Sequence, residues 1–381
     1  MEASEPLEVP TQCEKVGEAM PDIAGYGILL GLSVQALISL ALSFWVFFLT
    51  KLGRLDTQHP EGTPEHESEK KRLGFVSEIL MVGNDLQMIT GAALIITAIS
   101  SANHIDLYHL HLVFDTVSFV GISNAAALIC WTFMGAKTPK KKHHQIVPSH
   151  WTGRFRVSYM FAVLFLVMTV FLEIRLNGWS LTSEELGHCY ITTGITSANA
   201  THPGTDKAYV AIMAIWLLLV MLGALFCPAR FAKPLLILSF LQFPVHLYMM
   251  IKLRTENQGA LENHENENDW DFGQTTAVIL LAVAITQLIH QAVRYLKFER
   301  ALNKHGAEYA LAYDAKEHEE YGETITPSIM EQGLRGLRDV HQNLSKRNLS
   351  ETRLDRSGTA EQQEESYELM RNPEARPRTS L

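Results

Sequence analysis

Apolar residues gather along the chain in seven long stretches that polar segments separate. Each stretch is long enough to cross a hydrocarbon core about 30 Å thick as a helix, given a rise of about 1.5 Å per residue. Stretches such as 211–227 are apolar on every side, whereas helices of soluble proteins keep a polar face. The pattern therefore predicts an all-α polytopic membrane protein, a seven-helix transmembrane bundle. The predicted spans are 24–50, 75–102, 107–134, 157–175, 208–227, 232–251 and 274–296.

Polar segments flank this bundle, which we place at 24–296. The acidic segment 1–23 lacks the basic start and apolar run of a cleavable signal peptide. Residues 297–345 are compatible with helix, because a charged stretch is followed by Thr326-Pro327 and a periodic apolar side. Residues 346–381 are rich in Glu, Arg, Ser and Gln, which predicts disorder. These flanks explain why the mean hydropathy of the whole chain is only +0.04.

The distribution of Lys and Arg among the loops predicts the orientation. With the amino terminus outside, most basic residues near the membrane fall on the inner side, and the final outer loop is acidic from Glu262 to Asp271. We therefore expect an outside amino terminus and a cytoplasmic carboxyl terminus, in the plasma membrane or an endomembrane of the secretory pathway. The net charge of −9 is combined with basic inner loops, so it indicates a lipid bilayer as partner and no nucleic acid.

Two features fit this orientation. Asn199 begins a glycosylation sequon, Asn-Ala-Thr, in the loop that the orientation places outside. Cys13 and Cys189 would share the same oxidising compartment, so the sequence leaves two alternatives for them, a disulfide or two free thiols.

Polar residues inside the third span are the first functional candidates, because an ionisable group in hydrocarbon costs several kcal/mol unless it faces protein or water. At about 100° per residue, His111, Asp115 and Ser118 share one face, and Tyr108 flanks them. We expect this stripe to face the bundle interior. A His and a carboxylate four residues apart can relay protons or hold a cation or an amine; the alternative is a purely structural pair.

The other spans add weaker candidates. Asp85 and Gln87 lie about 160° apart on a regular helix, so they cannot both face one small cavity, and Asp85 lies either in the bilayer or at its inner surface. His246 follows the kink expected at Pro244, and Gln287 and His290 lie near the inner end of the last span, where extension toward lipid headgroups is the default. His246 lies toward the outside and His290 toward the inside, so these two do not converge with His111 on one obvious metal centre, and we predict no zinc, haem or other cofactor.

Four short runs stand out in and beside the spans: Asp85-Leu86-Gln87, Thr90-Gly91, Tyr108-His109 and Trp270-Asp271-Phe272-Gly273-Gln274. Together they resemble an uncharacterised family of multi-pass membrane proteins from filamentous fungi. The resemblance covers about residues 24–300. Where that family often has Thr-His-Leu in the third span, this chain has Ser123-Asn124-Ala125. The resemblance implies a seven-helix fold and a membrane location, and no activity.

The sequence leaves two classes of function open. A receptor or sensor would bind an outer ligand near Tyr108, His111, Asp115 and His246 and signal through the inner loops and a tail that binds a cytoplasmic protein. Against a typical G-protein-coupled receptor, Cys130-Trp131-Thr132 stands where Asp-Arg-Tyr is expected. A small-solute or ion transporter or channel would continue the polar path through Asp85 and Gln87 to Gln287 and His290, although no inverted repeat is visible. An enzyme is disfavoured, because no nucleophile with a placed base is present.

Overall fold

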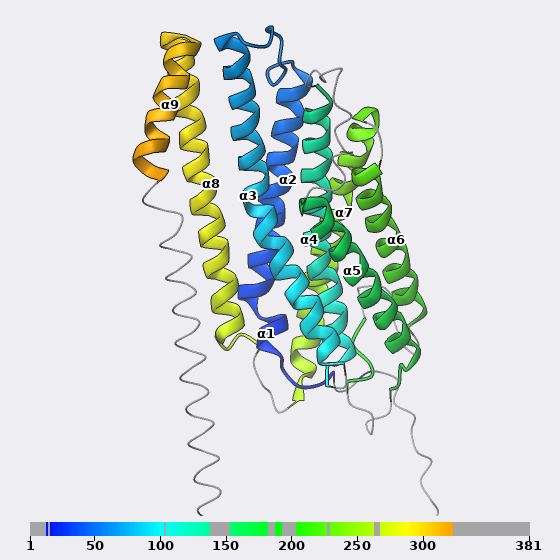
Figure 1. The fold of residues 1–381 in the computed structure, drawn as a ribbon. Helices are drawn as coiled ribbons and strands as arrows, with labels where there is room; N and C mark the ends of the chain where they lie inside the picture. Colours follow the sequence, from blue (N-terminus) through cyan, green and yellow to red (C-terminus); the bar gives the residue numbers. More distant parts are fainter. Residues whose placement is uncertain are drawn as a thin grey trace, which may run out of the picture. The chain divides into compact units, whose positions relative to one another are not determined.

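The computed structural model describes residues 13, 16–102, 104–137, 153–181, 187–192, 203–226, 229–262 and 267–322. Within these residues, seven helical segments are long and apolar enough to cross a membrane, so the prediction of an all-helical chain with seven spans is confirmed. The first span comprises α1 and α2. The helices are α1 (Pro21–Ala24), α2 (Tyr26–Lys51), α3 (Pro64–Ser100), α4 (Leu107–Lys137), α5 (Gly153–Asn177), α6 (Gly204–Phe226), α7 (Ala232–Asn257), α8 (Phe272–His305) and α9 (Ala307–Gly322) (Figure 1).

Two compact units divide the chain, Met1–Leu311 and Ala312–Leu381. All seven spans belong to the first unit. α8 is continuous to His305, so the helix passes through position 296, where the predicted bundle ends. The predicted Thr326-Pro327 helix and the tail 346–381 lie outside the described residues.

Helix caps explain why α3 and α8 are longer than the apolar stretches within them. The Thr63 side chain accepts a hydrogen bond from the His66 amide at 3.3 Å, and Pro64 occupies the first turn, so α3 begins eleven residues before the predicted span. The Asp271 carboxylate accepts one from the Gln274 amide at 3.0 Å and begins α8. The polar ends of the two helices are joined by an ion pair between Arg72 and Glu299.

The central helix of the bundle is α4. It contacts α2, α3, α5, α6 and α7, and its apolar window is 100% buried. Close packing depends on small residues: a Cβ atom on Gly91 of α3 would lie 2.7 Å from a methyl group of Val120 on α4. Polar groups on any side of α4 therefore face protein.

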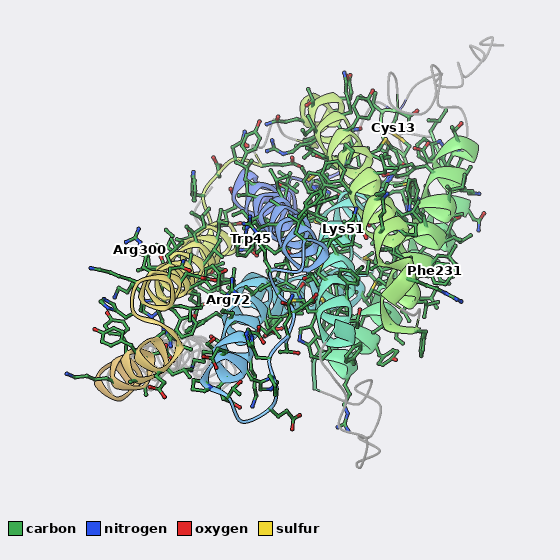
Figure 2. The ribbon with its side chains drawn as sticks, turned by 90° about the horizontal axis from the view of Figure 1, so that it is seen from above. Cys13, Trp45, Lys51, Arg72, Phe231 and Arg300 are labelled. Atoms are coloured by element: carbon green, nitrogen blue, oxygen red, sulfur yellow. A yellow bond between two sulfur atoms is a disulfide. The ribbon has the colours of Figure 1, made fainter. Side chains whose placement is uncertain are left out.

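The peripheral helix is α8, which packs on α2 and α3 and has only 11% of its apolar window buried. Viewed along the helices, α2 and α3 lie between α8 and the rest of the bundle (Figure 2). A Cβ on Gly27 of α2 would be 2.7 Å from the Gln274 carbonyl oxygen, so a glycine permits the close approach of α8 there. Apolar side chains on its outer side, such as Ile279 and Ile289, are exposed, as expected of a helix that faces lipid.

One end of the bundle, which we call the disulfide end, is covered by the loops that carry Cys13 and Cys189. A disulfide joins these residues across 176 positions, with their Cα atoms 5.9 Å apart. The Leu107 amide at the start of α4 donates a hydrogen bond to the Gly187 carbonyl at 2.9 Å. Gly17 and Gly187 both have positive φ, and any Cβ there would clash with the Asp106 carboxylate. These glycines therefore let both loops close over Asp106.

Candidate functional site

A buried carboxylate, Asp115, is the centre of the candidate site. Its Oδ1 atom lies 2.8 Å from Nδ1 of His246 on α7 and accepts a hydrogen bond from the Tyr209 hydroxyl on α6 at 2.7 Å. The Tyr209 hydroxyl also lies 3.2 Å from Nδ1 of His246. The carboxylate therefore joins α4, α6 and α7 near the disulfide end.

His111 is the second imidazole beside Asp115, one turn earlier on α4. Its Nε2 atom lies 3.7 Å from Oδ2 of Asp115, and its Nδ1 atom lies 2.9 Å from the hydroxyl of Tyr190, in the loop between α5 and α6. Gln242, one turn from His246 on α7, donates to the Met213 carbonyl at 3.0 Å, and its Nε2 atom lies 3.5 Å from Nε2 of His246. We call His111, Asp115, Tyr190, Tyr209, Gln242 and His246 the Asp115 cluster.

Burial makes an unpaired charge in this cluster unfavourable. Asp115, His111 and His246 are completely buried, and an unpaired ion in such a place is strongly unfavourable. Burial raises the pKa of the Tyr190 phenol well above its ordinary value, and the nearby Asp206 and Asp115 carboxylates raise it further. Tyr190 is therefore a neutral hydroxyl at physiological pH.

The cluster has hydrogen-bonding capacity that the described residues do not use. His111 Nε2, Asp115 Oδ2 and Gln242 Oε1 are buried without hydrogen-bond partners in this part of the chain. One carboxylate between two imidazoles can hold a shared proton or bind a small solute that donates hydrogen bonds. In the described residues no group of three or more His, Cys, Asp or Glu side chains is arranged to hold a metal ion.

A second polar cluster lies nearer the disulfide end than the Asp115 cluster. Its centre is Glu267, in the loop before α8. The carboxylate is fully buried; it lies 3.0 Å from His109 Nε2, accepts from the Tyr108 hydroxyl at 3.2 Å and lies 3.6 Å from Arg254. Arg254 also donates to the Ala24 carbonyl at 2.8 Å. Tyr108, which the sequence analysis placed beside His111, therefore contacts this Glu267 cluster and ties the last loop to α4 and α7.

A third set of polar groups crosses the middle of the bundle. Gln87 donates to the Leu32 carbonyl at 3.0 Å and accepts from the Ser123 hydroxyl at 2.8 Å, so it joins α2, α3 and α4. One turn away, Asn84 donates to Asn124 at 3.0 Å, and Asn124 donates to Ser158 on α5 at the same distance. These bonds satisfy amide groups that hydrocarbon would leave unpaired.

The remaining sequence candidates do not join the Asp115 cluster. The Ser118 hydroxyl is buried and donates to the Phe114 carbonyl of its own helix at 2.7 Å. Asp85 is exposed on α3 while Gln87 is buried, as the angle between them requires, and α3 is continuous through both positions. Gln287 and His290 are exposed on the outer side of α8. Asn199 lies outside the described residues.

Several residues that contact these sites, among them Tyr190, Tyr209 and Glu267, are not singled out by the sequence. Tyr190 and Glu267 lie in loops, where polar residues are expected and carry no signal. Tyr209 lies in the second turn of α6, where an aromatic residue is typical of a membrane interface. Only the packing of the helices identifies them.

No family model, no curated protein and no solved structure matches the chain. The membrane character of the chain and its site geometry therefore rest on its own residues.

Proposed function

We propose that the chain is a receptor-like sensor that binds a small ligand through the Asp115 cluster and responds at the opposite end of the bundle. The supporting observation is that one buried carboxylate on α4 holds a side chain from α6 and one from α7, and so joins three helices. A ligand that competes for Asp115 changes bonds in all three helices. It can therefore shift their relative packing, provided that it binds the two arrangements with different affinities.

The proposed orientation places the disulfide end outside, in agreement with the basic inner loops and the sequon at Asn199. An Asn199→Gln variant should lose an endoglycosidase-sensitive change in electrophoretic mobility. A protease added to intact cells should remove an epitope tag from the amino terminus and leave one on the carboxyl terminus. Both tags in one compartment would contradict this orientation.

An apolar layer beneath the cluster favours sensing over conduction. The rings of Phe119 on α4 and Phe243 on α7 are in contact, with centroids 5.1 Å apart, one turn further from the disulfide end than Asp115 and His246. The next polar side chains along α4 are Ser123 and Asn124, which bond to neighbouring helices. A solute that reached Asp115 would thus meet packed aromatic rings.

The chemistry of the cluster suggests the class of ligand. Its unsatisfied groups are one carboxylate oxygen, one imidazole nitrogen and one amide oxygen, which suit a small amine or another cationic hydrogen-bond donor. Access requires movement of the Glu267 cluster, because Tyr108, His109 and Glu267 are fully buried above the site. Ligand entry and movement of the last loop are therefore coupled in this proposal.

Hydrogen exchange of the protein in nanodiscs tests the proposal. A panel of small primary and heterocyclic amines is added, and exchange is followed in segments 137–156 and 306–345. An active amine should change exchange there in the wild type and in Gln287→Leu, an exposed control on α8, but not in Asp115→Asn. A change that survives Asp115→Asn would refute the assignment of the site.

A transporter or channel is the alternative class. The test is flux of the same amines and of protons in proteoliposomes, with empty liposomes and Asp115→Asn as controls. The sensor proposal expects no flux above that of empty liposomes. Flux that disappears in Asp115→Asn would replace the sensor with a transporter that uses the same residues.

A further inference from the structure

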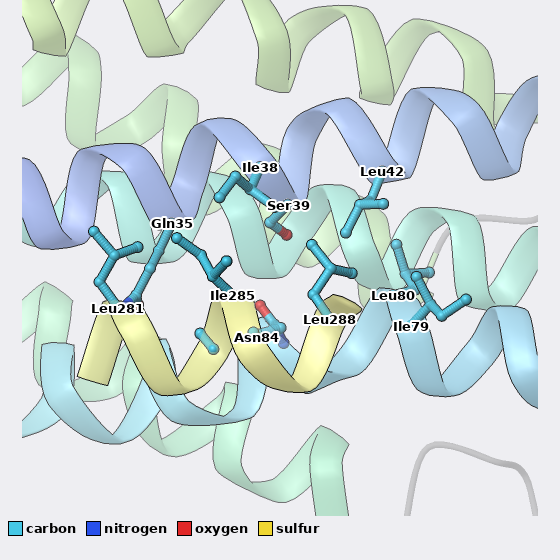
Figure 3. Close-up of a pocket in the computed structure, with 12 residues that line it drawn as sticks. Gln35, Ile38, Ser39, Leu42, Ile79, Leu80, Asn84, Leu281, Ile285 and Leu288 are labelled. Atoms are coloured by element: carbon cyan, nitrogen blue, oxygen red, sulfur yellow. The ribbon is translucent and has the colours of Figure 1, made fainter. Parts of the chain in front are cut away.

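A cavity of about 20 Å³ lies between α2, α3 and α8, away from the Asp115 cluster (Figure 3). Gln35 and Ser39 on α2 and Asn84 on α3 supply its polar side. The side formed by α8 is purely hydrocarbon and consists of Leu281, Ala284, Ile285 and Leu288. The cavity is thus polar on the bundle side and apolar on the side of the peripheral helix.

Three oxygen atoms around this cavity are buried without a hydrogen-bond partner among the described residues. They are Oε1 of Gln35, Oγ of Ser39 and Oδ1 of Asn84, on side chains that are 6%, 4% and 3% exposed. Figure 3 shows Ser39 and Asn84 pointing toward one another across the space between α2 and α8. A buried polar group without a partner is unfavourable, so three such groups around one cavity indicate a bound molecule that forms hydrogen bonds with them.

The three groups match the hydrogen-bonding capacity of one water molecule. The two amide oxygens accept hydrogen bonds, and the Ser39 hydroxyl can donate one. Water donates two and accepts at least one, and it needs about 10–15 Å³ of such space. A metal cation is disfavoured because no lining side chain carries a charge to balance it.

We propose that this cavity is a binding site for a single ordered water, held by Gln35, Ser39 and Asn84. The water extends the hydrogen-bonded chain from Asn84 through Asn124 to Ser158, so that polar contacts run from α2 to α5. α8 faces the water with carbon atoms only, so it can shift over the site without breaking a hydrogen bond. The site is independent of the proposed sensing function.

Substitutions at Ser39 distinguish a wet cavity from a dry one by the sign of the effect. Ser39→Val fills the space and displaces the water, which leaves Gln35 and Asn84 unsatisfied, so the midpoint of thermal unfolding should fall by about 2–5 °C. Ser39→Ala leaves room for the water and should lower it less. In a dry cavity both variants would remove an unpaired hydroxyl and Val would also fill a void, so both midpoints would rise.

Two further measurements keep the proposal falsifiable if Ser39→Val does not fold. A high-resolution map of the wild-type protein should show one density peak about 2.7–3.0 Å from Ser39 Oγ and Asn84 Oδ1; no peak there would overturn the proposal.

The unfolding midpoint of the wild type should be equal in sodium chloride and choline chloride. A rise in sodium chloride that Ser39→Ala abolishes would identify a cation and would also overturn the water assignment. Ser43→Ala is the control for Ser39→Ala, since the Ser43 hydroxyl donates a hydrogen bond to the Ser39 carbonyl of the same helix.

Discussion

The 18-residue apolar windows of α4 and α8 have nearly equal mean hydropathy, 1.7 and 1.8, yet their surroundings are opposite. The apolar window of α4 is entirely buried, whereas only 11% of that of α8 is buried. On α4, Asp115 contacts α7 and His111 contacts the loop before α6, while Gln287 and His290 on α8 are exposed. Hydropathy thus identifies a helix that crosses the membrane, but it does not distinguish the central helix from a peripheral one.

Removal of the Asp115 carboxylate should give the largest difference in unfolding free energy between a variant in α4 and a variant in α8. Asp115→Ala leaves the His246 imidazole and the Tyr209 hydroxyl without their shared acceptor, so we expect a loss of about 3–5 kcal/mol in unfolding free energy. Unfolding in detergent micelles, followed by intrinsic fluorescence, measures it. His290→Ala on α8 is the comparison variant; an equal loss in both would show that burial does not separate the helices.

The disulfide holds the loop that covers α4 and should have the next largest effect. Cys13→Ser removes a link across 176 positions, for which we expect a loss of about 2–5 kcal/mol. Dithiothreitol should lower the unfolding midpoint of the wild type and leave that of Cys13→Ser unchanged. If the reductant also shifts the midpoint of the variant, the effect comes from another source.

Substitutions at two glycines test how closely α8 and α4 pack against their neighbours. A Cβ on Gly27 meets the backbone of Gln274 on α8, whereas one on Gly121 of α4 meets the movable end of the Leu217 side chain. Gly27→Ala should cost about 1–3 kcal/mol and accelerate hydrogen exchange in α8 alone, and Gly121→Ala should cost less. Slower or unchanged exchange in α8 would argue against the close α2–α8 contact.

A pair of glutamines gives the finest comparison. Gln87→Leu removes the partner of the Leu32 carbonyl and of Ser123, so it should destabilise the bundle by about 1–3 kcal/mol. Gln287→Leu, on the exposed side of α8, should change stability by no more than about 0.5 kcal/mol. Comparable losses in the two variants, measured in one detergent, would place Gln287 in a contact that its exposure does not suggest.

The sequence predicts the seven spans because hydrocarbon requires about 20 apolar residues per crossing. It does not predict the helix ends, since caps such as Thr63 extend α3 through polar residues that hydropathy excludes. The separation of Asp85 from Gln87 also follows from the sequence, because it depends only on the geometry within one helix.

The composition of the candidate site depends on which helices are neighbours, and a single sequence does not contain that information. His111, Asp115 and His246 stand out because ionisable groups are rare in spans. Tyr108 lies beside His111 in sequence but contacts Glu267, a loop residue 159 positions away. Contacts between residues so far apart in sequence, such as His111 and Tyr190, depend on tertiary packing.

The contact between Asp115 and His246 joins α4 to α7, and a double-mutant cycle measures it most directly. Unfolding free energies are compared for the wild type, Asp115→Asn, His246→Gln and the double variant. Because the two side chains are buried and 2.8 Å apart, we expect a coupling energy of about 1–3 kcal/mol. Additive losses, with a coupling energy below about 0.3 kcal/mol, would contradict the pairing of these residues and with it the proposed site.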